Sequence, residues 1–197
     1  EQNPTAITRF FREAQTAARV SSPHLVNVMD VDEDHGLFYI VMEFIDGQTA
    51  AEYIENLQHQ GQLGASEREA LQIAFAATEG LAAAHEKEII HRDVKPVNIM
   101  VPRNRSGGFN LEASKLADLG LARNVDQGSR QELTGNFTAM GTPGFMAPEQ
   151  VLNAKSVGKP ADVFAMGATL YPLLCGVPPF RASPLRETMR VTALEPP

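Results

Sequence analysis

Residues 91–98, His-Arg-Asp-Val-Lys-Pro-Val-Asn, form the most specific pattern in this chain of 197 residues. They match H-R-D-x-K-P-x-N, and with this many specified positions a chance match is on the order of one in 10⁷ per window. The string brings a carboxylate, a cation and an amide close together in the chain. The alternative interpretation, a loop of solvated polar residues, is therefore disfavoured.

Three further strings follow in the chain. Asp118-Leu119-Gly120 comes directly after a short apolar run. Residues 141–149 read Gly-Thr-Pro-Gly-Phe-Met-Ala-Pro-Glu, and residues 161–171 read Ala-Asp-Val-Phe-Ala-Met-Gly-Ala-Thr-Leu-Tyr. The tripeptide D-L-G alone would usually be an ordinary turn. Its register with residues 91–98 is what makes it specific.

Together these strings resemble the catalytic lobe of eukaryotic-like (Hanks-type) Ser/Thr protein kinases. Leu119 and Phe164 stand where the family has Phe and Trp, and each replacement keeps an apolar side chain. The resemblance implies transfer of the γ-phosphoryl group of ATP to Ser or Thr hydroxyls of proteins, with ATP and Mg²⁺ as cofactors. It also implies that Asp162 anchors the backbone of the catalytic loop. The alanine-rich helices and residues 142–150 are typical of bacterial members.

The resemblance assigns the catalytic and metal-binding roles. Asp93 would accept the hydrogen bond of the substrate hydroxyl, and Lys95 would place a cation near the transferring phosphate. Asn98 and Asp118 supply hard oxygen ligands of the kind that suit Mg²⁺. Thr142 is expected to hydrogen-bond toward Asp93 and Lys95, a feature of the Ser/Thr branch.

A second group of residues would bind the nucleotide. Met42 corresponds to the gatekeeper before the interlobe hinge, and the backbones of Glu43 and Ile45 would face adenine. Met100 would pack under the adenine ring. Glu13 stands where the family has the glutamate of helix C, which pairs with a strand lysine on the phosphates. For the apolar members of this group, ordinary core packing is the alternative interpretation.

Two parts of a kinase domain have no counterpart in these residues. No lysine precedes Lys87, and no G-x-G-x-x-G occurs in the chain. We therefore expect a truncated kinase domain, with residues 1–197 alone inactive or nearly so.

The resemblance also indicates a regulatory site. Arg92 precedes the catalytic Asp93, and in the family this arginine often meets a phosphate on the activation segment. Thr138 is the expected phosphate-bearing residue and Thr134 the second candidate. Solvated loop threonines are the alternative interpretation. A dimer would allow one copy to phosphorylate the other.

The pattern of residues predicts an α+β fold, similar to a protein kinase, with an incomplete small lobe and a mostly helical large lobe. Residues 1–45 would be the remnant of the small lobe (helix C, two strands and the hinge). Residues 46–197 would be the large lobe with the catalytic loop and activation segment. The expected elements are helices over 4–20, 50–60, 66–88, 160–175 and from Ser183, and strands over 25–31, 37–45, 99–101 and 114–117, with a polar turn at 32–36.

Composition limits the classes of binding partner and the cellular compartment that we expect for this chain. The formal charge is −7, which argues against a nucleic-acid or anionic-membrane surface. Cys175 is the only cysteine, so no internal disulfide is possible, and a cytoplasmic location fits. The uncharged stretch 163–180 approaches the length of a membrane span, but its prolines favour a buried helix. The cytoplasmic part of a membrane-anchored kinase is the alternative setting.

Two other functions are alternatives to a protein kinase. A pseudokinase or scaffold would be expected to lack part of the set Asp93, Lys95, Asn98 and Asp118, and all four are present. A small-molecule phosphotransferase of similar fold would share an H-x-D loop. It would lack the string at residues 141–149, which therefore favours a protein kinase.

Overall fold

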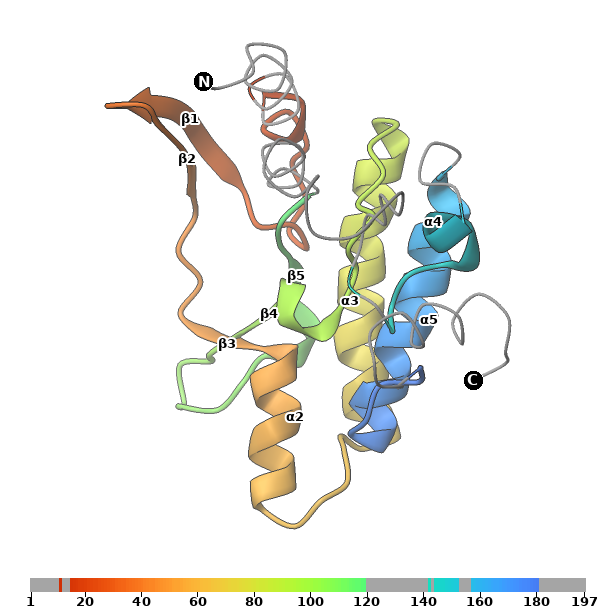
Figure 1. Ribbon diagram of the computed structural model, residues 1–197. Helices are drawn as coiled ribbons and strands as arrows, with labels where there is room; N and C mark the ends of the chain where they lie inside the picture. Colours follow the sequence, from red (N-terminus) through yellow and green to blue (C-terminus); the bar gives the residue numbers. More distant parts are fainter. Residues whose placement is uncertain (1–10, 12–14, 120–141, 143, 153–156, 181–197) are drawn as a thin grey trace.

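The computed structural model describes residues 11, 15–119, 142, 144–152 and 157–180. Their elements alternate short strands with longer helices, in accord with the predicted α+β class (Figure 1). The strands are β1 (Val28–Asp34), β2 (Leu37–Met42), β3 (Gly47–Thr49), β4 (Ile99–Pro102) and β5 (Lys115–Leu116). The helices are α2 (Ala50–His59), α3 (Glu67–Glu86), α4 (Pro148–Leu152) and α5 (Lys159–Cys175), with short 3₁₀ turns η1 (Pro96–Asn98) and η2 (Leu111–Ala113).

The first helix and the last predicted helix lie largely outside the described residues. Residues 11 and 15–17 are helical, which accords with the expected helix over 4–20, although the helical residues end at Ala17 rather than at residue 20. Ser21-Ser22-Pro23 follows this end, as expected from the restriction that proline places on the residue before it. The helix expected from Ser183 lies outside the described residues.

Both α2 and α3 begin at capping boxes. In α3 the Ser66 hydroxyl accepts from the Glu69 amide, and the Glu69 carboxylate accepts from the Ser66 amide. Thr49 and Glu52 repeat this arrangement at the start of α2. These reciprocal bonds satisfy amides that a helix start leaves unpaired. The start of α3 is thus where the sequence predicts it.

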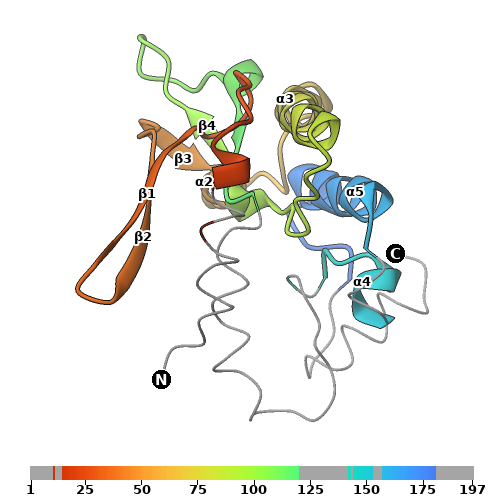
Figure 2. The same ribbon diagram turned by 90° about the horizontal axis from the view of Figure 1, so that it is seen from above.

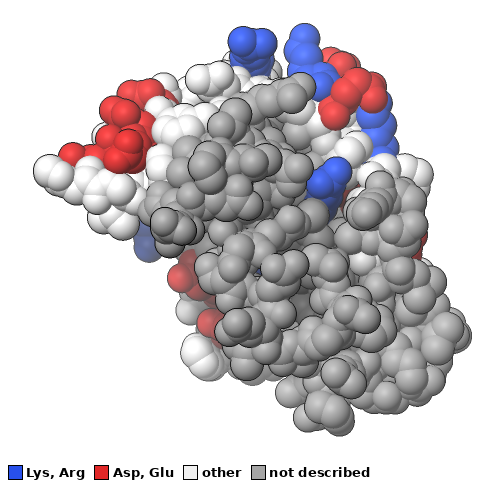
Figure 3. All heavy atoms as spheres, turned by 45° about the horizontal axis from the view of Figure 1, so that its top comes forward, with Lys and Arg blue, Asp and Glu red and all other residues white. Residues whose placement is uncertain are grey.

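The strands β1 and β2 form an antiparallel ribbon that projects from the rest of the described chain (Figure 1). The expected turn between the two strands is present but shorter than residues 32–36, because β1 continues to Asp34 and only His35 and Gly36 turn, both with positive φ. The carboxylates of β1 account for much of the exposed acidic surface at this end of the molecule, visible in Figure 3. The second strand ends at Met42 rather than Ile45.

A separate sheet has the strand order β3-β4-β5. The segments that contain the predicted catalytic and metal-binding residues adjoin its strands β4 and β5. The strand β3 was not predicted, because only three residues form it and they pair with β4 much later in the chain. Gly47 suits this position, since a Cβ there would lie 2.2 Å from the Val101 carbonyl oxygen. The sheet places Asn98, just before β4, beside the residues that follow β5.

The core lies between this sheet, α2, α3 and α5. The helices α3 and α5 run side by side in both views (Figures 1 and 2). Gly80 of α3 allows close approach of the chain before β1, because a Cβ would lie 2.2 Å from the His24 carbonyl oxygen. Side chains that are fully shielded include Leu25, Ile73, Ile99, Leu116 and Leu173. Among the described residues no helix is long and apolar enough to span a membrane.

Candidate active site

Asp93 lies at the centre of a cluster of side chains from the catalytic loop, residues 91–98. The Lys95 ammonium is 2.9 Å from its Oδ2 atom. The Asn98 amide nitrogen donates to the Asp93 carbonyl oxygen at 2.8 Å and to Oδ2 at 3.2 Å. The Asp93 side chain is only 10 % exposed, so these contacts hold the carboxylate in one place.

Thr142 joins this cluster from a distant part of the chain. Its hydroxyl donates to Asp93 Oδ1 at 2.9 Å and accepts from the Lys95 ammonium at 2.6 Å. The expected contacts of Thr142 with both residues are therefore present. One carboxylate oxygen of Asp93 thus meets Thr142, and the other meets Lys95 and Asn98.

The backbone of the catalytic loop is held by the buried Asp162 of α5. Its Oδ2 accepts from the His91 amide at 2.8 Å, and its Oδ1 accepts from the Arg92 amide at 2.7 Å. This is the anchoring contact that the sequence resemblance implied. Sequence reasoning missed His85, whose Nε2 lies 2.7 Å from Asp162 Oδ2. The available signal was a histidine in the last turn of a helix that ends just before the loop.

His91 connects the catalytic loop to the end of β5. Its Nε2 lies 2.8 Å from the Ala117 carbonyl oxygen, and its Nδ1 lies 3.3 Å from the Asp93 amide nitrogen. A carbonyl can only accept and an amide N–H can only donate, so the ring carries its proton on Nε2. Burial lowers the pKa of His91, because the charged ring would lose its hydration. His91 is therefore uncharged at pH 7, and its ring connects the catalytic loop to the end of β5.

Asp118 is placed beside Asn98 by the backbone. The Ala117 amide donates to the Asn98 carbonyl oxygen at 2.8 Å, and the Ala117 carbonyl is held by His91. Asp118 has a φ of 58° and an exposed side chain. Leu119 is 7 % exposed and packs in the core, which confirms that leucine fills an apolar position in D-L-G.

The donor set fits Mg²⁺ held mostly by a phosphorylated ligand. No group of three or more His, Cys, Asp or Glu residues in the described ranges is arranged to hold a metal ion. Mg²⁺ usually takes one or two protein oxygen ligands together with phosphates and water. Because the Asn98 nitrogen is committed to Asp93, its Oδ1 atom is the one suited to a metal, with Asp118 as the carboxylate.

The predicted hinge residues lie between β2 and β3. Met42 ends β2, and Met100 lies in β4 opposite Thr49. Within the part of the chain that the structure describes, the Glu43 carbonyl and the Ile45 amide have no hydrogen-bond partner. Adenine recognition by backbone groups would need these two atoms to be available.

The side chain of Glu43 is committed elsewhere. Its Oε1 accepts from the Asn27 amide at 2.8 Å and from the Lys115 ammonium at 2.7 Å. Burial alone would raise the pKa of Glu43, but the hydrogen bonds from Lys115 and Asn27 outweigh it and the pKa is lowered. Glu43 therefore fixes the hinge to β5 through its Oε1 atom.

Three of the predicted site residues, Glu13, Thr134 and Thr138, lie outside the described residues. Arg92 lies within the described part of the chain and has a left-handed φ of 66°. Its carbonyl oxygen accepts from the Gln150 amide nitrogen at 3.0 Å, a contact that sequence reasoning also missed.

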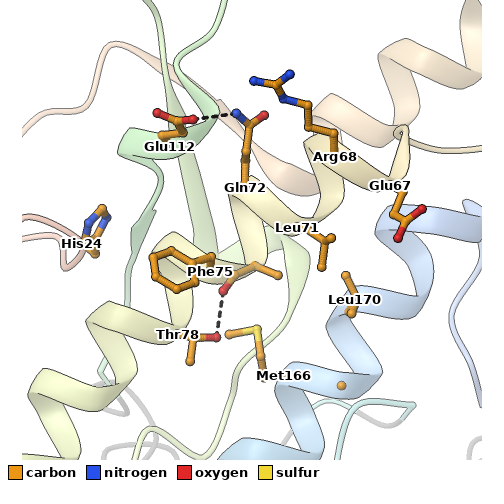
Figure 4. Close-up of a pocket in the computed structure, with 12 residues that line it drawn as sticks. His24, Glu67, Arg68, Leu71, Gln72, Phe75, Thr78, Glu112, Met166 and Leu170 are labelled. Carbon is orange, nitrogen blue, oxygen red and sulfur yellow. Dashed lines mark hydrogen bonds between the residues drawn. The ribbon is translucent and has the colours of Figure 1, made fainter.

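A groove lies away from these residues, along α3 and α5. Its volume is about 1080 Å³. In Figure 4 Leu71 lies toward Leu170, whereas the ring of Phe75 points toward His24. Gln72 donates to Glu112 at its rim. None of the residues of the Asp93 cluster lines this groove, so its apolar wall adds nothing to the polar site.

Comparison with known proteins places this geometry in one family. A protein kinase domain profile matches residues 1–195. The chain is 38 % identical over 173 residues to serine/threonine-protein kinase PknF of Mycobacterium tuberculosis, covering 88 % of this chain and 34 % of that protein. It is 36 % identical over 184 residues to PknB of Mycolicibacterium smegmatis, covering 91 % of this chain and 27 % of that protein. PrkC of Bacillus subtilis is 34 % identical over 174 residues, covering 88 % of this chain and 24 % of that protein.

The matched strings and the contacts around Asp93 agree with these similarities. The chain spans about a third or less of the length of these relatives. The resemblance to bacterial Ser/Thr kinases is confirmed. The chain belongs to the protein kinase domain family.

Proposed function

We propose that this chain is the catalytic core of a Ser/Thr protein kinase, which transfers the γ-phosphoryl group of ATP to Ser or Thr hydroxyls of proteins. The observation that carries the proposal is the arrangement of Lys95, Asn98 and Thr142 around one carboxylate, that of Asp93. Phosphoryl transfer depends mainly on positioning and charge, so an oriented carboxylate with an adjacent cation is what the reaction requires.

In this proposal Asp93 orients the attacking hydroxyl and accepts its proton. Lys95 lies between Asp93 and Thr142, and its charge offsets the negative charge that develops on the transferred group. His91 stays neutral, so it adds no charge and only holds the end of β5 in place.

Mg²⁺, when bound with ATP, neutralises charge on the phosphates. Asn98 Oδ1 and the Asp118 carboxylate are the groups that would hold it. Adenine would lie between Met42 and Met100, against the Glu43 carbonyl and the Ile45 amide, which have no hydrogen-bond partner among the described residues. Glu13 would orient the phosphate-contacting lysine of a complete domain. By "complete kinase domain" we mean this chain within a protein that also supplies a glycine-rich loop and that lysine.

Two rival functions are less well supported. A pseudokinase would not need the Asp93 cluster to be assembled, and here each of its contacts is formed. A small-molecule phosphotransferase would not need Thr142, which contacts both Asp93 and Lys95.

Regulation and location extend the proposal. Phosphorylation of Thr138, or else Thr134, would bring three acceptor oxygens to the Arg92 guanidinium and order the activation segment. A dimer would place one copy's segment in the other copy's site. The domain would work in the cytoplasm, alone or as part of a membrane-anchored protein. Mass spectrometry of active enzyme should find phosphate on Thr138, and full activity of Thr138→Ala would contradict this.

The acceptor and the need for a complete domain can be tested in one assay. The complete kinase domain, given γ-labelled ATP and Mg²⁺, should label a Ser/Thr protein substrate and not a tyrosine substrate or a small alcohol. Residues 1–197 alone should show no turnover. Labelling of the small alcohol alone would favour the small-molecule enzyme. Intact nucleotide binding without any transfer would favour the pseudokinase.

A further inference from the structure

The peptide group that joins Arg92 to Asp93 is held at both of its polar atoms. Its carbonyl oxygen accepts from the side-chain nitrogen of Gln150, Nε2, at 3.0 Å. Its N–H, that of Asp93, faces Nδ1 of His91 at 3.3 Å. This peptide fixes the direction in which the Asp93 side chain leaves the backbone.

The conformation of this segment is a strained one that needs support. Arg92 has a φ of 66°, in the left-handed region that costs a residue with a side chain about 1–2 kcal/mol. Asp162 holds the Arg92 amide at 2.7 Å, on the opposite side of the residue from Gln150. The strained residue is thus held at its N–H by α5 and at its carbonyl by α4.

The surroundings of Gln150 hold its side chain in the position that contacts the Arg92 carbonyl. It is 1 % exposed, and its Oε1 accepts from the Ala147 amide at 2.9 Å while its nitrogen reaches Arg92. The backbone N–H of Gln150 donates to the Ala147 carbonyl at 2.9 Å. Met146 and Ala147 beside it are also buried, so the side chain has little freedom to leave.

We infer that Gln150 is a positioning residue, which couples the residues ending in A-P-E to the orientation of Asp93. This inference rests on the proposed kinase function. Thr142 and Gln150 then act on two sides of the same residue, one at the Asp93 carboxylate and the other at the peptide before it. Displacement of the 142–150 segment would release both contacts together.

Two variants of Gln150 test the role. Gln150→Met keeps the length and approximate volume but removes both the donor to the Arg92 carbonyl and the acceptor for the Ala147 amide. Gln150→Glu keeps the acceptor for Ala147 and places a carboxylate oxygen against the Arg92 carbonyl. In the complete kinase domain each should lower kcat by about 10- to 100-fold, because small misplacements of a reacting group have effects of this size. KM for ATP should stay within about twofold, since the proposed nucleotide contacts are not touched.

A purely structural role of Gln150 is distinguished from a positioning role by measuring kcat per folded site. Titration with a tight-binding nucleotide gives the concentration of folded sites, and kcat is then expressed per site. Gln58→Met is the matched control, because that side chain also donates to backbone carbonyls, those of Leu63 and Gly176, away from the site. It should leave kcat per site unchanged.

A second measurement does not depend on activity. Amide hydrogen exchange at Arg92 and Asp93 should be faster in both Gln150 variants than in the wild type and the Gln58→Met control. Unchanged kcat per site together with unchanged exchange would overturn the inference. If the wild-type domain transfers no phosphate to any acceptor, the proposed function fails. The exchange measurement then still decides whether Gln150 positions the loop.

Discussion

The catalytic loop and the β1–β2 ribbon are built in opposite ways. The loop has little regular secondary structure, yet Val94 and His91 are fully buried and its backbone is held by side chains from α4 and α5. The ribbon has regular strand pairing between neighbours in the chain, yet most of its side chains are exposed. Regular structure and a fixed geometry are therefore separate properties in this molecule. At the site, geometry comes from long-range contacts between side chains and backbone.

This difference predicts that substitutions of the same type have unequal effects in the two regions. We expect the largest effect from Asp162→Asn. The new amide nitrogen would face one of the buried N–H groups that the carboxylate now accepts from, which should lower the free energy of unfolding by about 2–3 kcal/mol. Activity per folded site should fall as well, because the loop loses its anchor.

The matched control is Asp32→Asn in the exposed part of β1, which should change the free energy of unfolding by less than about 0.5 kcal/mol. Denaturant unfolding of both variants provides the measurement. Equal effects of the two substitutions would show that the loop is not held as described.

A pair of valines gives the next largest contrast. Val94 of the loop is fully buried, whereas Val41 of β2 is 39 % exposed. Truncation of Val94 to Ala should cost about 2 kcal/mol of stability, from lost apolar burial and an unfilled space. Val41→Ala should cost less than about 0.5 kcal/mol. Urea midpoints with unchanged slopes would measure the difference, and a larger loss at Val41 would reverse the comparison.

Two tyrosines provide the most subtle test. In α2, burial and the hydrogen bond to Glu69 raise the pKa of Tyr53 from 10.0 to about 12. Because the folded-state pKa is raised, its stabilising contribution is complete below pH 10 and is lost as the pH rises from 10 to about 12. In the ribbon, the charge of Asp32 is the main cause that raises the pKa of Tyr39.

An absorbance titration distinguishes the two causes. Added salt should lower the pKa of Tyr39, because the charge that acts on it is exposed and can be screened. The titration of Tyr53 should respond much less. A salt response at Tyr53 as large as that at Tyr39 would contradict the burial assigned to Tyr53.

Motif spacing and capping signals predicted much of the fold and of the site. The Ser66–Glu69 pair located the start of α3, and the kinase resemblance anticipated the contacts of Thr142 and Asp162. The strand β3 escaped prediction because three residues carry no periodicity and pairing with β4 is what makes them a strand. The contacts of His85 and Gln150 escaped because each depends on a residue far away in the chain.

The most direct test of the central claim is the steady-state kinetics of Asp93→Asn in the complete kinase domain, measured together with its nucleotide affinity. Asn has nearly the shape of Asp but cannot accept the hydroxyl proton. We expect kcat to fall by at least about a hundredfold, the usual contribution of a positioned base. Nucleotide affinity should remain nearly unchanged, whereas Asp118→Asn should weaken the binding of Mg²⁺ and ATP. Near-normal turnover by Asp93→Asn would contradict the role given to the Asp93 cluster.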